Sequence, residues 1–314
     1  MKNNVFGLIG IGVRNANWNA DFDGLPKRDG NDIYKGSPYA LQYCMKSQWI
    51  NRGKRVLGIK TIKPNGACSK LKERYFDLFK IEDTKIDKKD SDDVRQNKIE
   101  TVRNNLLSCK DVKNFGVAYT GENAMSIKGV VQFTDGVNKY ENANLVNEQI
   151  LSPYANSNKD ETSTSTLGTK HTLDEAHFIY DFSIFPREYD KYICDDFEGY
   201  TEEDYEDFKK VSLIAVSNYN SKTKAGCKNE FAMFIKVKEE HNYLLDLNYL
   251  QDYVKVYKEE NKVIYDLSLL NDLLTKVADK IENIEMYYNP RTINVSNFNK
   301  INTKVYDLIT MEEI

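Results

Sequence analysis

The chain has 314 residues, of which 40% are hydrophobic and 29% charged, and its formal net charge is −4. This length and composition can fill the core of one large domain with insertions, or of two small domains, and they exclude a disordered polymer. A membrane helix needs about 18 or more consecutive apolar residues, whereas the N-terminal apolar run Val5–Val13 is short and interrupted by glycines. We therefore expect a cytoplasmic protein with no signal peptide and no membrane partner.

The cysteines and histidines do not form a recognisable site. The five cysteines are scattered and never spaced as CxxC, which is typical of reduced, partly buried residues and not of a disulfide framework or a zinc site. The three histidines are dispersed. The glycines of Gly7–Gly12 lead into an asparagine-rich turn, where a nucleotide-binding loop would need the start of a helix. The sequence therefore predicts no metal, no cofactor and no catalytic constellation.

Charge is distributed unevenly along the chain. Residues 25–75 carry twelve Lys or Arg against three Asp or Glu, whereas residues 190–210 carry nine acidic residues against three lysines. A chain that is acidic as a whole is unusual for a nucleic-acid-binding protein, but this asymmetry allows one side of the molecule to bind a polyanion. The acidic side can then contact the basic side of a neighbouring subunit. Ordinary solvated surfaces are the alternative explanation.

The N-terminal part predicts a strand followed by a helix. Val5–Val13 is continuously apolar and rich in Val and Ile, which is typical of a central strand. Gly10 and Gly12 share one face of it, so either another backbone or a tightly packed helix can approach there. Ser37-Pro38 supplies an N-cap and a first helical residue, and Gly53 is the expected stop of this helix. Its apolar stripe consists of Leu41, Cys44, Met45 and Trp49.

Two insertions are predicted in the middle of the chain. Lys70–Phe79 and Asp92–Leu107 have helical patterns and define a helical insertion at about residues 64–112. Ile127–Phe133 is typical of a strand. Residues 135–174 are rich in Asn, Ser and Thr, and forty weakly structured residues inside a compact domain are more typical of a projecting, thumb-like arm than of a connection.

The next part predicts a strand, a helix and a strand. Phe178–Ile184 alternates as a strand does, Thr201 begins a helix with an apolar face that extends to Tyr219, and Glu230–Val237 alternates again. The complete order is strand, helix, strand, strand, helix, strand, which is the split βαβ order of ferredoxin-like, RRM-like antiparallel sheets. The predicted fold class is therefore α+β, with a single RRM-like domain over residues 1–314, the two large insertions and a C-terminal extension at about 241–314. The elements expected in the extension are a helix at Leu267–Ile281 and strands near Glu285 and Val305.

Three segments resemble one known family, and they occur in the order that the family has. The first, GLIGIGVRNANWNADFDGLPKRDG followed by YKGSPYALQYCMKSQWINRG, combines a strand, an asparagine-rich turn, a Leu-Pro-basic element and a helix with a basic residue. The others are CKDVKNFGVAYTGENAMSIKGVVQF, with Asp-Val-x-x-Phe-Gly and Gly-x-x-Gln-Phe, and TLGTKHTLDEAHFIYDFSIF. Together they resemble the Cascade backbone subunits of type I CRISPR effector complexes, in the DevR-like and Csh-type branches of the repeat-associated mystery protein superfamily. The resemblance covers roughly the first 190 residues.

This resemblance implies a CRISPR RNA-binding subunit that is not an enzyme. Such a subunit polymerises with copies of itself along the guide, contacts other Cascade subunits and presents the guide for pairing with target DNA. Contacts to phosphates do not depend on sequence, as a protein that must accept every spacer requires. The residues expected to contact phosphates are Arg14, Lys27, Arg28, Lys46 and Arg52, those expected to contact sugar or backbone are Asn15 and Asn17, and further candidates are Lys128, Gln132, Lys170 and His171.

Three other functions stay open at this point. Type III relatives in the superfamily cleave RNA with a metal and a loop aspartate, and Asp21, Asp23 and Asp29 are the acids positioned for that chemistry here. Turn formation is the alternative explanation for Asp21 and Asp23. A scaffold that binds other subunits and no RNA is disfavoured by the basic segment. A solitary RNA-recognition domain is disfavoured because no aromatic-rich strand supplies a platform for base stacking.

Overall fold

The computed structural model describes residues 1–81, 89–121, 123–152, 166–299 and 302–314. Its main element is a mixed sheet in which β1 (Val5–Ala16) pairs antiparallel with both β8 (Thr166–Ile184) and β9 (Cys227–Val237). The order in the sheet is β14-β12-β9-β1-β8-β6-β2, and β5 and β7 also pair with β8. The bounds of the other strands in this sheet are β2 (Lys35–Gly36), β5 (Val131–Phe133), β6 (Gly136–Asn138), β7 (Leu145–Ser152), β12 (Ile281–Tyr288) and β14 (Thr303–Asp307).

Strand β1 confirms the predicted central strand at Val5–Val13. Its residues are buried on both faces of the sheet, as a continuous apolar run requires. The side chains of Ile9 and Ile11 belong to one hydrophobic core, and those of Phe6 and Leu8 belong to a second core on the other face. Two cores thus meet at a single strand, and each is covered by a different layer of the molecule.

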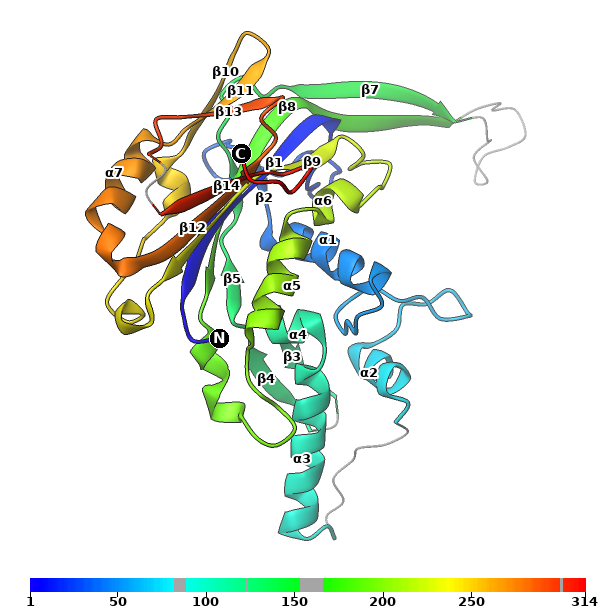
Figure 1. Cartoon of the computed structure of the whole chain (residues 1–314). Helices are drawn as coiled ribbons and strands as arrows, with labels where there is room; N and C mark the ends of the chain where they lie inside the picture. Colours follow the sequence, from blue (N-terminus) through cyan, green and yellow to red (C-terminus); the bar gives the residue numbers. More distant parts are fainter. Residues whose placement is uncertain (82–88, 122, 153–165, 300–301) are drawn as a thin grey trace.

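The first core lies under a layer of helices (Figure 1). The predicted helix from Pro38 is α1 (Pro38–Asn51), and Gly53 follows it with a φ of 73° that favours glycine. The helix predicted from Thr201 to Tyr219 is two helices, because the Asn229 side chain accepts the backbone amides of Val216 and Ser217 where one helix would have continued. The layer also contains the helices α4 (Lys110–Phe115), α5 (Glu202–Ser212) and α6 (Ala215–Asn218).

The segment between the first helix and the long strand β8 contains the predicted pair of helices, α2 (Leu71–Phe79) and α3 (Asp92–Leu107). The prediction of one strand at Ile127–Phe133 is wrong. Met125–Lys128 is β4, which pairs with β3 (Gly116–Tyr119), whereas β5 pairs with β8. Gly129 separates the two strands, and a Cβ there would lie 2.2 Å from the Phe115 carbonyl carbon. The close approach of that turn to α4 explains the break.

Residues 135–174 were expected to be weakly structured, and for the described residues this is wrong. β7 and β8 form a continuous antiparallel ladder from Leu145↔Leu173 to Ser152↔Thr166, and β6 precedes it. Figure 1 shows this hairpin extending beyond the body of the molecule. Its threonines suit a strand better than the loop that its polar composition suggested. Residues 153–165, which hold most of the Ser/Thr-rich run, lie outside the described residues.

The C-terminal residues cover the second core. β10 (Lys255–Glu259), β11 (Lys262–Asp266) and β13 (Ile293–Ser296) form a small sheet. The helix predicted at Leu267–Ile281 is shorter, α7 (Ser268–Lys276), and β12 and β14 account for the predicted strands near Glu285 and Val305. Short 3-10 helices complete the chain: η1 (Pro186–Tyr192), η2 (Glu239–His241), η3 (Leu250–Tyr253) and η4 (Ala278–Lys280). Among the described residues, no helix is both long and apolar enough to cross a bilayer.

The C-terminal layer fills the space that the glycines of β1 leave. A Cβ on Gly10 would lie 2.7 Å from the Tyr265 hydroxyl, and a Cβ on Gly12 would lie 2.1 Å from the Glu230 carboxylate. At both positions the nearest atoms belong to side chains and not to a helix or to another backbone, unlike either expectation for the two glycines. The sequence could not reveal this because the side chains that pack there come from β9 and β11.

Two ionisable side chains of β8 are buried under the same layer. Asp181 accepts the Gln251 amide at 2.7 Å, and burial raises the pKa of Asp181 to about 7. The His177 ring lies 2.7 Å from the Glu230 carboxylate, to which Tyr265 also donates. Burial lowers the pKa of His177, but the negative charge and hydrogen bond of Glu230 more than offset this, so the net shift is upward.

We predict that Asp181→Asn flattens the dependence of stability on pH. Because the folded-state pKa of Asp181 is about 7 and the ordinary value is 3.8, the folded chain retains a proton that the unfolded chain releases between those values. The free energy of unfolding of the wild type therefore falls as pH rises from about 4 to 7, and the variant lacks this part of the decline. Urea unfolding at pH 4, 5.5, 7 and 8 measures the difference.

Asp272→Asn is the control for this prediction, because Asp272 is exposed on α7 and its loss removes one negative charge without touching the layer contact. Parallel pH profiles for the wild type and Asp181→Asn would contradict the assignment of a neutral, buried Asp181 in the folded chain.

Candidate nucleic-acid interface

The candidate site lies where β1 ends, and Asn17 holds its parts together. Asn17 is 4% exposed, and its amide nitrogen donates to the Gly24 carbonyl at 3.1 Å and to the His171 carbonyl at 3.3 Å. Its backbone amide donates to the Thr223 carbonyl at 2.9 Å. One residue thus connects the loop after β1, the base of the β7–β8 hairpin and the loop before β9.

The loop after β1, residues 19–34, is a pair of small hairpins. Ala20 pairs with Pro26, and Arg28 pairs with Tyr34. Three carboxylates stabilise these turns by accepting backbone amides: Asp21 from Phe22, Asp23 from Leu25, and Asp29 from both Asn31 and Ile33. These are turn contacts, as the alternative explanation of the aspartates expected. In the part of the chain that the structure describes, no three His, Cys, Asp or Glu side chains gather as metal ligands would.

Three adjoining hollows follow this loop along the base of the hairpin, and we call them together the arm groove. The first, of about 540 Å³, lies between Asn17, Gly24, His171 and Lys224. The second, of about 390 Å³, and the third, of about 640 Å³, share Arg28 and Leu145. Asp23 lines both the first and the second hollow. The three hollows are therefore neighbours, and together they extend from the loop before β9 to the base of β7.

Positive charge gathers at the first hollow. Lys170, Lys222 and Lys224 line it, and Asp23 is its acidic member. Lys170 forms an ion pair with Glu148 at 3.2 Å, whereas Lys222 is exposed and has no ion pair within the described ranges. Lys224 donates to the Trp18 carbonyl and lies over the Trp18 ring, and burial lowers its pKa. This end of the groove is suited to an anion.

The structure brings together some of the predicted RNA-contacting residues. Asn17, Lys170 and His171 line the first hollow, and Arg28 lines the other two. The His171 ring lies 2.6 Å from the Asn147 side chain. Arg28 donates to the Asp32 carboxylate and to the Tyr34 hydroxyl, each at 2.5 Å, and the hydrogen bond to Asp32 raises the pKa of Arg28.

Three other predicted residues are near Asn17 or Arg28 in the sequence but do not line a hollow: Arg14, Asn15 and Lys27. Arg14 and Asn15 are exposed at the end of β1, and Asn15 has a φ of 48°, which asparagine tolerates better than most residues. Arg14 lies 3.8 Å from the Glu175 carboxylate. Lys27 is half-buried. Its backbone amide donates to the Asn19 carbonyl, and its carbonyl accepts a hydrogen bond from the Lys35 amide.

The other predicted residues lie elsewhere. Lys46 donates to the Gly58 carbonyl at 3.1 Å, and burial lowers its pKa. Arg52 forms an ion pair with Asp207 at 3.0 Å. Lys128 pairs with Glu188 at 3.2 Å. The Gln132 side chain donates to the Gly129 carbonyl at 2.8 Å. None of these four side chains lines the arm groove.

Lys222 and Lys224 were not predicted from the sequence. They lie in the segment SKTKAGCK before β9, where lysine recurs three times in eight residues. These lysines could have indicated a binding residue. They lie about 200 residues after the loop that follows β1, so the sequence alone did not show that the two segments meet. The register of β9 against β1, with Cys227 opposite Val13, brings it to the groove.

The basic and acidic segments meet within the same chain. Asp207 forms an ion pair with Arg52 and also accepts a hydrogen bond from the Trp49 ring nitrogen at 2.8 Å. Asp204 pairs with Lys110 at 2.8 Å and with Lys113. The exposed acids that remain in this region include Asp195, Asp196, Glu198 and Glu203. Part of the acidic segment therefore balances cations inside the fold, and its rim is free for a partner.

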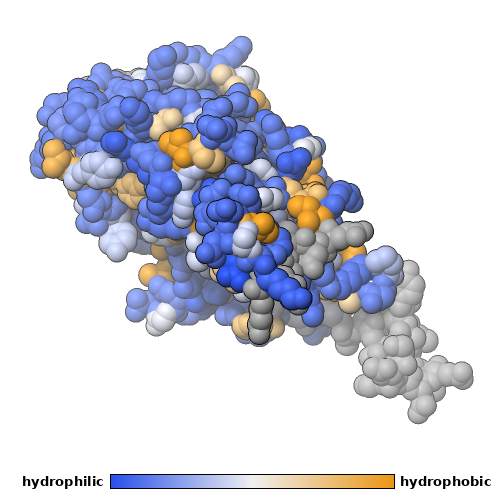
Figure 2. All heavy atoms as spheres, turned by 90° about the horizontal axis from the view of Figure 1, so that it is seen from below, coloured by the Kyte–Doolittle hydropathy of each residue, from blue (hydrophilic) through white to orange (hydrophobic). Residues whose placement is uncertain are grey.

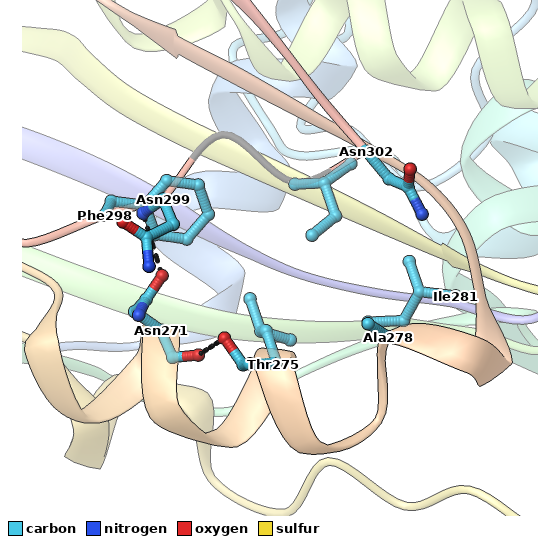
Figure 3. A pocket seen from close by; sticks show the side chains of 9 residues that line it. Asn271, Thr275, Ala278, Ile281, Phe298, Asn299 and Asn302 are labelled. Atoms are coloured by element: carbon cyan, nitrogen blue, oxygen red, sulfur yellow. Dashed lines mark hydrogen bonds between the residues drawn. The ribbon is translucent and has the colours of Figure 1, made fainter.

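One small cavity and one face of the surface bear on whether the molecule has other kinds of site. A cavity between α7 and Phe298, Asn299 and Asn302 (Figure 3) has a volume of about 20 Å³, room for about one water molecule. Two of its polar side chains are engaged, since Asn271 accepts a hydrogen bond from the Asn299 backbone amide at 2.8 Å and Thr275 donates to the Asn271 carbonyl at 2.7 Å. Figure 2 shows a face on which, outside the grey atoms, hydrophilic side chains predominate and apolar ones occur in small separate groups.

We predict that Asn17→Ala loosens both the loop and the base of the hairpin. The change removes the hydrogen bonds to the Gly24 and His171 carbonyls, and such a bond typically contributes about 0.5–1.5 kcal/mol. Hydrogen exchange should accelerate at residues 19–28 and 168–173 together. Asn31→Ala is the control, since Asn31 is exposed in the same loop. Faster exchange in one segment alone would contradict the linking role of Asn17.

The fold and the groove define a class of protein first: an α+β binding protein whose site is an open surface groove beside a projecting hairpin. A family model then identifies the family, since the model for CRISPR-associated protein Cas7 matches residues 3–277. The chain belongs to this family. No curated protein sequence matches the chain.

Solved structures resemble this one over nearly their whole length. A chain of a structure titled "CRISPR RNA-guided surveillance complex, pre-nicking" has a TM-score of 0.53 at 11% identity, with 97% of this chain and 96% of that chain covered. A chain of a "CRISPR RNA-guided surveillance complex" has a TM-score of 0.46 at 10% identity, with 96% and 94% covered. At such identities the first likeness concerns the fold alone.

Proposed function

We propose that this chain is a CRISPR RNA-binding backbone subunit of a Cascade-type antiviral effector complex. Copies of it polymerise along the guide, contact other Cascade subunits and leave the guide free to pair with target DNA. The observation that carries the proposal is the match to the Cas7 family over residues 3–277. The row of neighbouring hollows in the arm groove, with lysines at one end, is the physical support for a polyanion as the ligand.

The guide binds along the arm groove in this proposal. Lys170, Lys222 and Lys224 contact its phosphates at the first hollow, and Arg28 does so further along. Seven further residues stay predicted contacts of this chain with the guide: Arg14, Asn15, Lys27, Lys46, Arg52, Lys128 and Gln132. Asn17 acts by positioning, because its amide already binds two carbonyls. Phosphate contacts of this kind accept any spacer sequence.

The core of the proposed subunit is ferredoxin-like, or RRM-like. The order β9-β1-β8-β5, with antiparallel pairing throughout, supports this, because it equals the 4-1-3-2 order of the split βαβ fold. α1 follows the first of these strands and α5 the third, as that fold requires. Residues 64–112 and 135–174 are then insertions, and residues 241–314 form an extension that covers the sheet face opposite the helices.

The β7–β8 hairpin acts as a thumb that reaches a neighbouring copy. Its support is its projection from the body of the molecule (Figure 1). The exposed acidic rim near Asp196 and Glu203 is the counterpart for a basic surface of the next subunit. Complementary charge fixes the register between copies more than it adds affinity.

Catalysis is not part of the proposed function. Cleavage by the type III route needs a loop aspartate free to bind a metal or a proton, whereas Asp21, Asp23 and Asp29 each accept backbone amides of their own turns. Incubation of the purified protein with guide and target RNA in Mg²⁺ or Mn²⁺ tests this. Products that disappear in Asp23→Ala would establish the nuclease and overturn the non-catalytic assignment.

The proposal as a whole is tested by the RNA that the protein carries. The tagged chain is purified from its native host, washed at increasing salt, and its RNA is sequenced. Stoichiometric short repeat-spacer RNAs that are lost at high salt are the expected result. RNA-free protein at low salt would favour a scaffold that binds other subunits alone.

We predict that Lys170→Glu with Lys222→Glu weakens RNA binding by about tenfold or more at 0.1 M salt, equally for unrelated RNA sequences, because both side chains line the first hollow. For single strands the slope of log K against log salt changes by about 0.7 for each phosphate contact, so the slope should fall by about 1.4. Fluorescence anisotropy across a salt series measures both quantities.

Lys276→Glu is the matched control, since Lys276 is exposed on α7 in the C-terminal layer, away from the groove residues. An unchanged slope in the double variant, or an equal loss in the control, would contradict the groove as the path of the RNA.

A further inference from the structure

Strand β9 contains a bulge, and Glu230 is the residue that the bulge leaves without a partner. Gly10 of β1 lies opposite Phe231 and Ile11 lies opposite Asn229, so Glu230 pairs with no residue of β1. A bulge bends its strand and turns a side chain in a new direction, and bulges are frequent beside functional sites. The Glu230 side chain is only 13% exposed. The bulge therefore places a carboxylate inside the fold.

The carboxylate of Glu230 reaches across β1 to a histidine on β8. His177 lies opposite Gly12 in the pairing of β8 with β1, and β1 separates β8 from β9. A Cβ on Gly12 would lie 2.1 Å from the Glu230 carboxylate, so glycine leaves open a path that another residue would block. The carboxylate lies 2.7 Å from His177 Nδ1 and accepts a hydrogen bond from the Tyr265 hydroxyl at 2.5 Å. The bulge and the glycine together build this contact.

The surroundings of the His177 ring favour its protonated form. His177 is 2% exposed, and its Nε2 lies 3.7 Å from the Glu175 carboxylate. Within the described residues, neither Nε2 nor that Glu175 oxygen has a hydrogen bond. A neutral ring that donates from Nδ1 to Glu230 turns a lone pair toward the Glu175 oxygen, whereas a protonated ring turns an N–H toward it. Among the residues that the structure describes, His177 is also the only ion-pair partner of Glu230.

His177 also supports one wall of the third hollow, which residues 138–140 help to form. The His177 backbone amide donates to the Asn138 side chain at 2.9 Å, and its carbonyl accepts a hydrogen bond from the Lys139 amide at 2.9 Å. The same Asn138 oxygen accepts the Tyr140 amide at 3.2 Å. The Tyr140 ring packs edge-on against the His177 ring, with the ring centroids 5.5 Å apart. A change at the His177 ring therefore acts on a wall of the arm groove.

We propose that His177 is a positioning residue for RNA binding, which holds residues 138–140 in their binding form while its ring carries a proton between Glu230 and Glu175. The inference rests on the proposed function and adds to it a dependence of guide binding on pH. Hydrophobic residues in place of a buried ion pair are often as stabilising, so stability alone does not account for the bulge at Glu230 and the opening at Gly12.

Other ionisable groups surround this contact on several elements. Arg14 of β1 lies 3.8 Å from the Glu175 carboxylate, and Lys258 of β10 lies 2.7 Å from it. Lys139 turns its side chain to Asp252, at 3.5 Å. The ring neighbours are the tyrosines Tyr140, after β6, and Tyr265, on β11, whose hydroxyl donates to Glu230.

The direction of the pH dependence follows from the pKa of His177. Burial lowers this pKa, but the negative charges of Glu230 and Glu175 more than offset the effect, so the pKa in the folded chain lies above the ordinary value of 6.5. The stabilisation that the protonated ring provides is therefore complete below pH 6.5 and is lost as the pH rises through the folded-state pKa. The wall of the third hollow should loosen over the same range.

The test measures RNA affinity by fluorescence anisotropy from pH 6 to pH 9 at one salt concentration, for the wild type, His177→Gln and Glu230→Gln. We expect the wild-type affinity to fall by about fivefold or more across this range. His177→Gln should bind at every pH about as weakly as the wild type does at pH 9. Glu230→Gln removes a negative charge that raises the pKa of His177, so the fall in affinity should occur at lower pH.

His241→Gln is the matched control, since His241 lies in η2 and lines none of the three hollows. This variant should keep the wild-type profile. A part of the pH dependence that persists in His177→Gln belongs to other groups, and the difference between the two profiles is the part assigned to His177.

Two measurements on the unsubstituted protein keep the inference testable where a variant does not fold. The chain has three histidines, and nitrogen NMR of their rings distinguishes a protonated from a neutral His177, whose titration should coincide with the fall in affinity. Hydrogen exchange of the RNA-free protein, corrected for the intrinsic effect of pH, should become faster at residues 137–141 over the same range.

Each outcome supports or overturns the inference. A His177 ring that is neutral at pH 6 in the folded chain, or a pH dependence that is the same in the wild type and His177→Gln, overturns it while RNA binding itself stands. Exchange at residues 137–141 that does not respond as the ring titrates leaves His177 a packing role alone and also overturns it. Absence of RNA binding by the wild type at every pH removes the proposed function and the inference together.

Discussion

The structure depends on the burial of β1 on both of its faces. A strand in that position must pair on both edges and carry apolar side chains in both directions, and Val5–Val13 does so except at its glycines, Gly7, Gly10 and Gly12. Gly10 admits Tyr265 from the C-terminal layer, and Gly12 admits Glu230 from β9. One strand therefore fixes the helical layer, the C-terminal layer and the neighbours β8 and β9, and a one-residue shift in its register would exchange the two cores.

The arm groove follows from where this strand ends. After Val13 the side chains become polar, Asn15 adopts a positive φ, and Asn17 turns its amide toward two separate segments. The partners of β1 determine what gathers there, because β8 continues into the hairpin and β9 is preceded by Lys222 and Lys224. The site is thus built from three parts of the chain that only the sheet brings together, and its open form suits a long polymer better than a small molecule.

Local patterns predicted most elements, and long-range pairing decided the rest. The apolar run of β1, the Ser37-Pro38 start and the helical spacing of α2 and α3 each depend on neighbouring residues, and each prediction is confirmed within a few residues. The hairpin at 145–173 was missed because its stability comes from a partner strand and not from apolar content. For the same reason the site was predicted in part: Asn17, Lys170 and His171 meet at one hollow, whereas the contributions of Lys222 and Lys224 needed the register of β9 against β1.

The net charge of −4 is compatible with a polyanion because charge acts locally. Screening limits the interaction between exposed charges to about 10 Å at ordinary salt, so the exposed acids near Asp196 and Glu203 contribute little at a groove that is distant from them. Asp204 and Asp207 engage three cations, Arg52, Lys110 and Lys113, so these charges are balanced within the fold. The cations that matter for a ligand are then the few that line the groove, and their number sets its salt dependence. A protein that must hold a guide firmly yet accept every sequence therefore depends on where these few cations lie, and not on an excess of positive charge.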